Sequence, residues 1–290
     1  MTGTNSSTAE QITEGINLSG KTYLITGCNS GIGLETMRVL ALRGAKVYGL
    51  ARSLEKATQA CESIIGNAVP MVCDLSDPIS IKVLIDTIKE PIDGIIANAG
   101  VMALQERRVE HGIEYHMLVN HMGHYMLITR LLKSLKVDGR VVVVSSAAHA
   151  YARGKGLILD DLSWERPYKP WAAYGHSKLA NILFSKELSK RLSVGQTSNS
   201  LHPGVIDSSL WRHLPSDEAE RMKNNFGAKS TALGAATSVF LAVHPSVSGV
   251  TGAYFSNGKI GKATALAQDP IQAKKLWDVS EELAVRLLKE

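Results

Sequence analysis

The sequence has few cysteines, no long apolar run and no signal-like leader, and each absence excludes a class of protein. Its three cysteines, Cys28, Cys61 and Cys73, show no CxxC spacing, which argues against a disulfide framework or zinc site and for a reducing compartment. No stretch approaches the ~18 apolar residues of a membrane span. Residues 1–15 are polar and lack the apolar core of a signal peptide. We therefore expect a soluble, cytoplasmic protein whose residues 1–17 form a flexible extension.

Charge of one sign is never concentrated either. The chain holds 32 basic and 27 acidic residues, a formal net charge of +5, and no basic block is longer than two residues. This spread argues against a nucleic-acid partner. His116, His121 and His124 lie close in sequence, but no carboxylate completes a recognisable ligand set, so no metal site is expected.

Short apolar segments alternate with helix-length amphipathic segments. Strands are expected at 21–26, 46–51, 68–73, 93–100, 140–146, 197–204 and 252–255, and helices up to about 43, at 53–64, 77–89, 112–135, 172–193, 216–224 and 230–243, and at the C-terminus. Strands without polar alternation are typical of a parallel sheet covered on both faces. The repeated strand–helix order predicts an α/β, Rossmann-like, doubly wound, mostly parallel seven-stranded sheet with helices on both faces. We expect one domain over residues 18–290.

The segment TGCNSGIG, residues 26–33, joins the first strand to its helix. Gly27 permits a tight turn, Gly31 lets the backbone approach a pyrophosphate, and Gly33 allows close packing of helix and sheet. Phosphates would lie at the helix N-terminus, where free N–H groups favour anions. An ordinary glycine-rich turn is the alternative. The residues expected to bind a nucleotide here are Gly27, Asn29, Ser30, Gly31, Ile32 and Gly33.

The end of the second strand indicates which cofactor is preferred. This strand ends YGLARS, where an acidic residue would select NAD, but none is present and Arg52 follows at once. A guanidinium can bind a 2′-phosphate in a bidentate manner, so NADP(H) is favoured over NAD(H). Asp74, with Leu75 beside it, is expected near the adenine amino group; a helix-capping or turn role for Asp74 is equally open.

Tyr174 and Lys178 are four residues apart in AAYGHSK, on one face of an expected helix. Spacing alone leaves two interpretations open, a surface pair or a catalytic acid with its electrostatic partner. A nearby ammonium and an oxidised nicotinamide would both favour the tyrosine phenolate. Such a group could exchange a proton with a carbonyl oxygen during hydride transfer.

The motifs TGCNSGIG, ANAG at 97–100, Asn120, VVVVSS at 141–146, YGHSK at 174–178 and HPG at 202–204 occur in this order. Together they resemble a classical short-chain dehydrogenase/reductase over roughly residues 18–260. The stretches NHMGHYMLITRLL, YGHSKLANILFSKEL and LHPGVIDSSLW are most similar to the retinol-dehydrogenase-like branch.

The resemblance implies roles for several residues. It implies Tyr174 as general acid/base, Lys178 as its partner and holder of the nicotinamide ribose, and Asn120 as part of a water relay. Ser146 is the implied substrate-polarising serine, with Ser145 as the fallback. Further cofactor contacts are implied for Asn98, Ala99, Gly100, Pro203, Gly204, Ile206 and Ser208, where Ser208 stands in place of the usual threonine.

The expected function is an NADP(H)-dependent oxidoreductase acting on a lipophilic ketone, aldehyde or alcohol. The long interval between Ser146 and Tyr174 resembles the extended substrate loop of the same branch. Tyr151, Trp164, Trp171, Leu210 and Trp211 could face the substrate or simply pack the loops. Three alternatives are a non-catalytic NADP-binding regulator, a tetrapyrrole-type reductase and, against the glycine spacing, an extended-branch enzyme. The resemblance also implies a possible homodimer or homotetramer.

Overall fold

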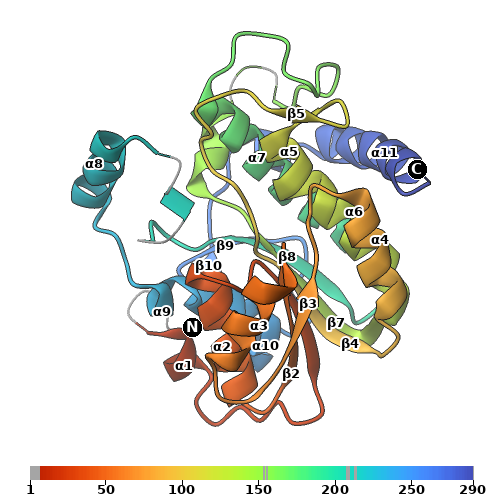
Figure 1. Ribbon diagram of the computed structural model, residues 1–290, viewed down its shortest axis with the longest axis vertical. Helices are drawn as coiled ribbons and strands as arrows, with labels where there is room; N and C mark the ends of the chain where they lie inside the picture. Colours follow the sequence, from red (N-terminus) through yellow and green to blue (C-terminus); the bar gives the residue numbers. More distant parts are fainter. Residues whose placement is uncertain (1–6, 153, 155, 207–209, 212–213, 290) are drawn as a thin grey trace.

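A computed structural model describes residues 7–152, 154, 156–206, 210, 211 and 214–289. Its main sheet has eight strands in the order β10-β9-β8-β7-β4-β1-β2-β3 (Figure 1). The strands are β1 (Thr22–Thr26), β2 (Lys46–Ala51), β3 (Asn67–Val72), β4 (Ile92–Ala97), β7 (Leu135–Val144), β8 (Thr197–His202), β9 (Tyr254–Ser256) and β10 (Lys259–Ile260). All pairs are parallel except β9–β10, so the predicted mostly parallel Rossmann-like sheet is confirmed.

The strand count differs from the seven expected because β10 was missed. It pairs antiparallel with β9 through a turn at Asn257 and Gly258, both with positive φ. Asn-Gly is the preferred pair for such a hairpin turn. The strand has only two residues, and both are exposed, so the sequence contains no hydrophobic pattern that would predict it.

Helices cover both faces of the sheet. One apolar core lies under α4 (Pro78–Thr87), α6 (Gly123–Leu131), α7 (Pro170–Ser189) and α11 (Pro270–Leu287). The other lies under α1 (Ala9–Ile12), α2 (Gly31–Leu42), α3 (Leu54–Glu62) and α10 (Ala236–Val243). Helices α4, α7 and α11 each begin with a proline. Proline suits the first position of a helix because the backbone N–H there has no acceptor within the helix. No helix within the described ranges is long and apolar enough to cross a membrane.

The segment before β1 departs from the expected loose extension. Helix α1 starts with a capping box at Thr8, and Ala9 is fully buried. Arg43 from the end of α2 donates to the carbonyl of Glu10 at 2.7 Å and to the Thr13 hydroxyl at 3.0 Å. Residues 9–13 are thus packed against the domain by burial and by these long-range hydrogen bonds. The polar sequence of the segment did not indicate this packing.

The expected helix over 112–135 is broken into several pieces. A small hairpin of β5 (Val109–Glu110) and β6 (Ile113–Glu114) precedes it. Then follow α5 (Tyr115–Met117), a π-helical turn (Leu118–Met122), α6 and a 3-10 turn (Leu132–Ser134). π turns occur often at functional sites.

The helix expected at 216–224 is confirmed as α8 (Ser216–Phe226), which stands away from the sheet in Figure 1. The helix expected at 230–243 is divided into α9 (Thr231–Gly234) and α10.

Candidate active site

A cavity of about 1020 Å³ opens at the carboxyl ends of the parallel strands, where doubly wound folds bind ligands. It brings together most of the predicted site. The predicted residues that line it are Gly27, Asn29, Ser30, Gly31, Ile32, Gly33, Arg52, Asp74, Leu75, Asn98, Ala99, Gly100, Ser146, Tyr174, Lys178, Pro203, Gly204 and Ile206. Asn120 lies behind the wall, and Ser208 falls outside the described residues.

The glycine loop is closed by tight contacts between β1, α2 and β4. A Cβ atom on Gly33 would lie 2.0 Å from the Gly27 carbonyl oxygen and 2.5 Å from Asn98 Nδ2. Asn98 in turn donates through Nδ2 to the Thr26 carbonyl at 2.9 Å. Gly27 and Gly31 have positive φ, which glycine adopts without strain. These contacts fix the first turn of α2 at the cavity.

Two cations stand at the end of β2. Arg52 and Lys56 both line the cavity and are exposed. Lys56 was not predicted as a site residue; its place in the first turn of α3, capped by Ser53, brings it beside Arg52. After β3, the strand next to β2, Asp74 Oδ1 accepts from the Ser76 backbone N–H at 2.9 Å and from the Ser76 hydroxyl at 2.7 Å. Asp74 is therefore a turn aspartate that also lines the cavity.

Tyr174 and Lys178 extend from α7 into one enclosed space, each only 4% exposed. Lys178 Nζ lies 5.7 Å from the Tyr174 ring centroid and donates to the Val144 carbonyl at 3.0 Å. Burial raises the pKa of Tyr174 to about 12, opposed by a hydrogen bond with Ser146. Burial also lowers the pKa of Lys178 to about 8. Burial, more than the lysine, therefore dominates the pKa of this tyrosine.

The two adjacent serines face different neighbours. Ser145 donates its hydroxyl to the Lys178 carbonyl at 2.7 Å and is buried. The Ser146 hydroxyl accepts from the Ala148 N–H at 3.1 Å. Both serines line the cavity, but Ser146 is the one that also lowers the pKa of Tyr174 against the effect of burial, and its substrate-polarising role stays a prediction.

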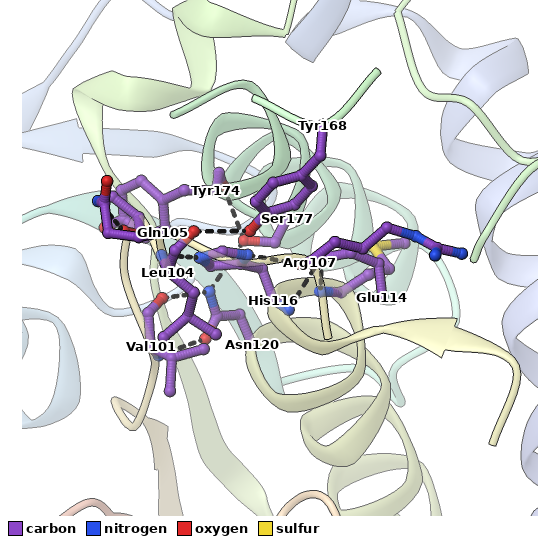
Figure 2. A network of polar contacts seen from close by, with 12 residues as sticks. Val101, Leu104, Gln105, Arg107, Glu114, His116, Asn120, Tyr168, Tyr174 and Ser177 are labelled. Carbon is purple, nitrogen blue, oxygen red and sulfur yellow. Dashed lines mark hydrogen bonds and ion pairs between the residues drawn. The ribbon is translucent and has the colours of Figure 1, made fainter. Parts of the chain in front are cut away.

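Asn120 sits in the π turn behind the cavity wall (Figure 2). Its Oδ1 accepts from the Val101 N–H at 2.8 Å, and its Nδ2 donates to the Val101 carbonyl at 3.0 Å and the Ser177 hydroxyl at 2.9 Å. None of these bonds goes to Lys178. The side chain thus holds the chain after β4. A Cβ on Gly100 would lie 2.9 Å from Asn120 Oδ1 and 3.6 Å from Lys178 Nζ, so both groups border Gly100 and the water relay stays a prediction.

His124 joins three parts of the site. Thr26 Oγ1 accepts the N–H groups of Asn98 and Ala99, both at 2.9 Å, so its own proton goes to His124 Nε2 at 2.8 Å. The remaining ring proton is then on Nδ1, which donates to the Asn120 carbonyl at 3.0 Å. Burial lowers the pKa of His124 to about 4, so the ring is neutral at pH 7. It links the ends of β1 and β4 to the π turn.

His121 is another of the three histidines for which no metal site was expected. It hydrogen-bonds the Ser280 hydroxyl of α11 at 2.8 Å. Across the described part of the chain, no group of three or more His, Cys, Asp and Glu side chains is placed to hold a metal ion.

Apolar side chains line the half of the cavity that lies beyond Tyr174. They are Met102, Tyr151, Trp171, Leu210, Trp211 and Met222. The Trp171 indole N–H donates to Glu218 of α8 at 2.5 Å, which ties α8 to α7 across this half. Trp164 instead packs edge-on against His176, with ring centroids 5.4 Å apart. Of the five apolar residues singled out in the sequence, Trp164 alone is not part of the cavity lining.

Comparisons with known proteins agree with this arrangement. The family model described as short chain dehydrogenase matches residues 21–219. The chain is 39% identical to Retinol dehydrogenase 12 of Homo sapiens, over 92% of this chain and 87% of that protein. It is 38% identical to Short-chain dehydrogenase TIC 32 B, chloroplastic, of Brassica napus, over 96% and 93%. A solved structure from Mycobacterium Paratuberculosis shares the fold with a TM-score of 0.77 and 31% identity, over 93% and 95%.

The matched region holds the glycine loop, the serine and the Tyr174–Lys178 pair in one cavity. The family match extends over more than half of the chain, and the identity to retinol dehydrogenases extends over nearly all of it. The chain therefore belongs to the short-chain dehydrogenase/reductase family of oxidoreductases, within its retinol-dehydrogenase-like branch.

Proposed function

We propose that this protein is an NADP(H)-dependent carbonyl reductase or alcohol dehydrogenase for lipophilic substrates. The observation that carries the proposal is that Ser146 and the buried pair Tyr174 and Lys178 share one cavity with the glycine loop. A donor hydroxyl, a proton source and a buried amine next to a dinucleotide-type loop suit reduction of a carbonyl.

The residues present fit a nicotinamide cofactor with a 2′-phosphate. Gly33 lets α2 pack closely on the Gly27 carbonyl and Asn98, which places the first turn of the helix, whose N–H groups would bind a pyrophosphate, at the cavity. Arg52 and Lys56 offer two positive charges where the 2′-phosphate would lie. Asn98, Ala99 and Gly100 would border the adenine ribose, and Pro203, Gly204 and Ile206 the nicotinamide. Ser208 stays a proposed carboxamide contact.

The bound cofactor would supply the hydride. Tyr174 would donate its phenolic proton to the carbonyl oxygen, while the Ser146 hydroxyl hydrogen-bonds the same oxygen. Lys178 is buried beside the tyrosine, so its ammonium would stabilise the phenolate that remains. Asn120 would shape the path by which the tyrosine is reprotonated, through the backbone that it holds.

The apolar half of the cavity favours a lipophilic carbonyl or alcohol. Among the described residues, its lining from Met102 to Met222 is apolar and aromatic, and Glu218, the one carboxylate that the described lining holds in this half, is engaged by Trp171. Several of the relatives are named retinol dehydrogenases, so retinaldehyde is a suitable first probe.

Compartment and assembly are proposals as well. We propose a cytoplasmic location, although two relatives are named chloroplastic, and a homodimer or homotetramer. Cell fractionation and light scattering test the two.

Oxidation of NADPH and of NADH against retinaldehyde and a panel of ketones and aldehydes tests the activity. Tyr174→Phe should lower turnover by ~10²–10⁴-fold, the usual contribution of a positioned general acid, and leave the Kd for NADPH nearly unchanged. Unchanged turnover in Tyr174→Phe contradicts the mechanism. Binding of NADPH without turnover of any carbonyl would favour the non-catalytic regulator. Binding of a tetrapyrrole pigment would favour the tetrapyrrole-type reductase.

A further inference from the structure

The chain that follows β4 forms the wall of the cavity beside the tyrosine. Met102 lines the cavity, and Met102 and Ala103 pack with Tyr174 in one small apolar cluster. Ala103 has a φ of 46°, which residues other than glycine rarely adopt. Such a conformation persists only where the surroundings fix it, so contacts on both sides of Ala103 must hold this wall.

The wall, residues 101–104, is held at both ends by side chains from other elements (Figure 2). Asn120 bonds both the N–H and the carbonyl of Val101. At the other end, the Leu104 N–H donates to His116 Nε2 at 3.2 Å, and the Leu104 carbonyl accepts from the Tyr168 hydroxyl at 2.9 Å.

His116 is itself fixed by a buried acid. Glu114 Oε1 lies 2.7 Å from His116 Nδ1, and both side chains are almost fully buried. Glu114 Oε2 also accepts the backbone N–H groups of His116 and Met117, at 3.0 and 3.2 Å. Because Nε2 accepts the Leu104 N–H, the ring proton is on Nδ1 and is donated to Glu114. The acid therefore sets the tautomer that can hold the wall.

We propose that His116, oriented by Glu114, is a positioning residue that holds the Met102–Ala103 wall of the substrate pocket against Tyr174. The centroid of the His116 ring lies 6.1 Å from that of the Tyr174 ring, and no hydrogen bond joins the two side chains. His116 would therefore affect the position of the substrate through residues 101–104, which it holds, and not through the reacting hydroxyl. The proposal deepens the proposed function and rests on it. It makes residues 101–104 a determinant of substrate fit, independent of the cofactor half of the cavity.

Two variants separate the two bonds of the imidazole. In His116→Gln the terminal amide lies where Nε2 was, so it keeps an acceptor for the Leu104 N–H. In His116→Asn the amide lies where Nδ1 was, so it keeps the donor to Glu114 and leaves the Leu104 N–H unbonded. We expect His116→Asn to raise the KM of the preferred carbonyl by about tenfold, with kcat changed less than about threefold and the Kd for NADPH unchanged. His116→Gln should stay within about twofold of the wild type.

Tyr168→Phe removes the other hydrogen bond to Leu104 and lies in a half-buried loop. It should raise the KM in the same way, and it serves as the test if both histidine variants fail to fold. In a double-mutant cycle, Met102→Ala and His116→Asn should be non-additive in KM, because both act through the wall. Additive effects, or equal KM values for the Gln and Asn variants, overturn the proposal.

Hydrogen exchange at the Leu104 amide tests the wall without any substrate. It should be about tenfold faster in His116→Asn than in the wild type and His116→Gln. Equal exchange rates in all three proteins would overturn the proposal that His116 holds the wall. If the wild type turned over none of the carbonyls, the proposed function would be overturned, and the exchange rates would still test whether His116 holds the wall.

Discussion

At the residue scale, two neighbouring serines with the same chemistry are distinguished by what their hydroxyls reach. Ser145 donates its hydroxyl to the Lys178 carbonyl, whereas Ser146 acts on Tyr174, whose pKa it lowers. Their positions at the end of β7 follow from the strand, in which side chains alternate between opposite sides of the sheet.

Ser146→Ala should lower kcat/KM by ~10²–10³-fold, because one donor to the carbonyl oxygen is lost. Ser145→Ala should instead lower the free energy of unfolding by ~1 kcal/mol, because the Lys178 carbonyl loses its buried partner. Steady-state kinetics and urea unfolding of both variants check the pair. If Ser145→Ala were the variant that loses activity with unchanged stability, the assignment would be reversed.

At the scale of elements, the strand–helix joint at Gly33 is the least tolerant point of the cavity. Gly33→Ala places a methyl group 2.0 Å from the Gly27 carbonyl, so α2 must shift. We expect a loss of stability of ~1–3 kcal/mol from overpacking and at least about tenfold weaker NADPH binding. Gly261→Ala is the matched control, since its Cβ would meet nothing nearer than 3.4 Å. Fluorescence titration with NADPH and thermal unfolding measure both, and equal NADPH binding by the two variants would contradict the expectation.

Sequence reasoning succeeded where the signal is local. The apolar strands, the glycine loop and the order of motifs predicted the Rossmann-like sheet, and most of the predicted site residues line one cavity. It failed where the structure depends on distant partners. Helix α1 is fixed by Arg43, about 30 residues away, and Leu104 by His116 and Tyr168. Lys56 was missed although its position is set locally, since it lies in the first turn of α3, which begins soon after β2 ends.

At the scale of the whole molecule, buried neutral histidines make stability depend on pH. Burial lowers the pKa of His121 to about 3 and those of His124 and His176 to about 4. An unfolded histidine has a pKa of about 6.5, so below that value the unfolded chain binds more protons and the folded state loses stability. The contribution is complete above pH 6.5 and is lost as the pH falls towards 4.

We expect the free energy of unfolding to fall between pH 6.5 and 5.5 by up to ~1.4 kcal/mol for each such histidine. Urea unfolding at pH 7.5, 6.5 and 5.5 measures this slope before most carboxylates begin to titrate. His176→Gln should reduce the slope by one histidine's share, because Gln keeps an acceptor for the Ile158 N–H that His176 Nε2 now accepts at 2.6 Å. A stability that is flat over this range would contradict the assignment.

The π turn at Leu118–Met122 also decides how this chain can change in length. A π turn holds one more residue than an α-helical turn, and each residue of a helix rotates its neighbour by about 100°. Asn120 faces Val101, while Gly123 packs so closely on Leu75 that a Cβ would lie 2.3 Å from its carbonyl oxygen. Deleting one residue here would restore a regular helix and turn one of these two contacts away from its partner. A one-residue deletion within Leu118–Met122 should therefore cost stability, although it would make the helix regular.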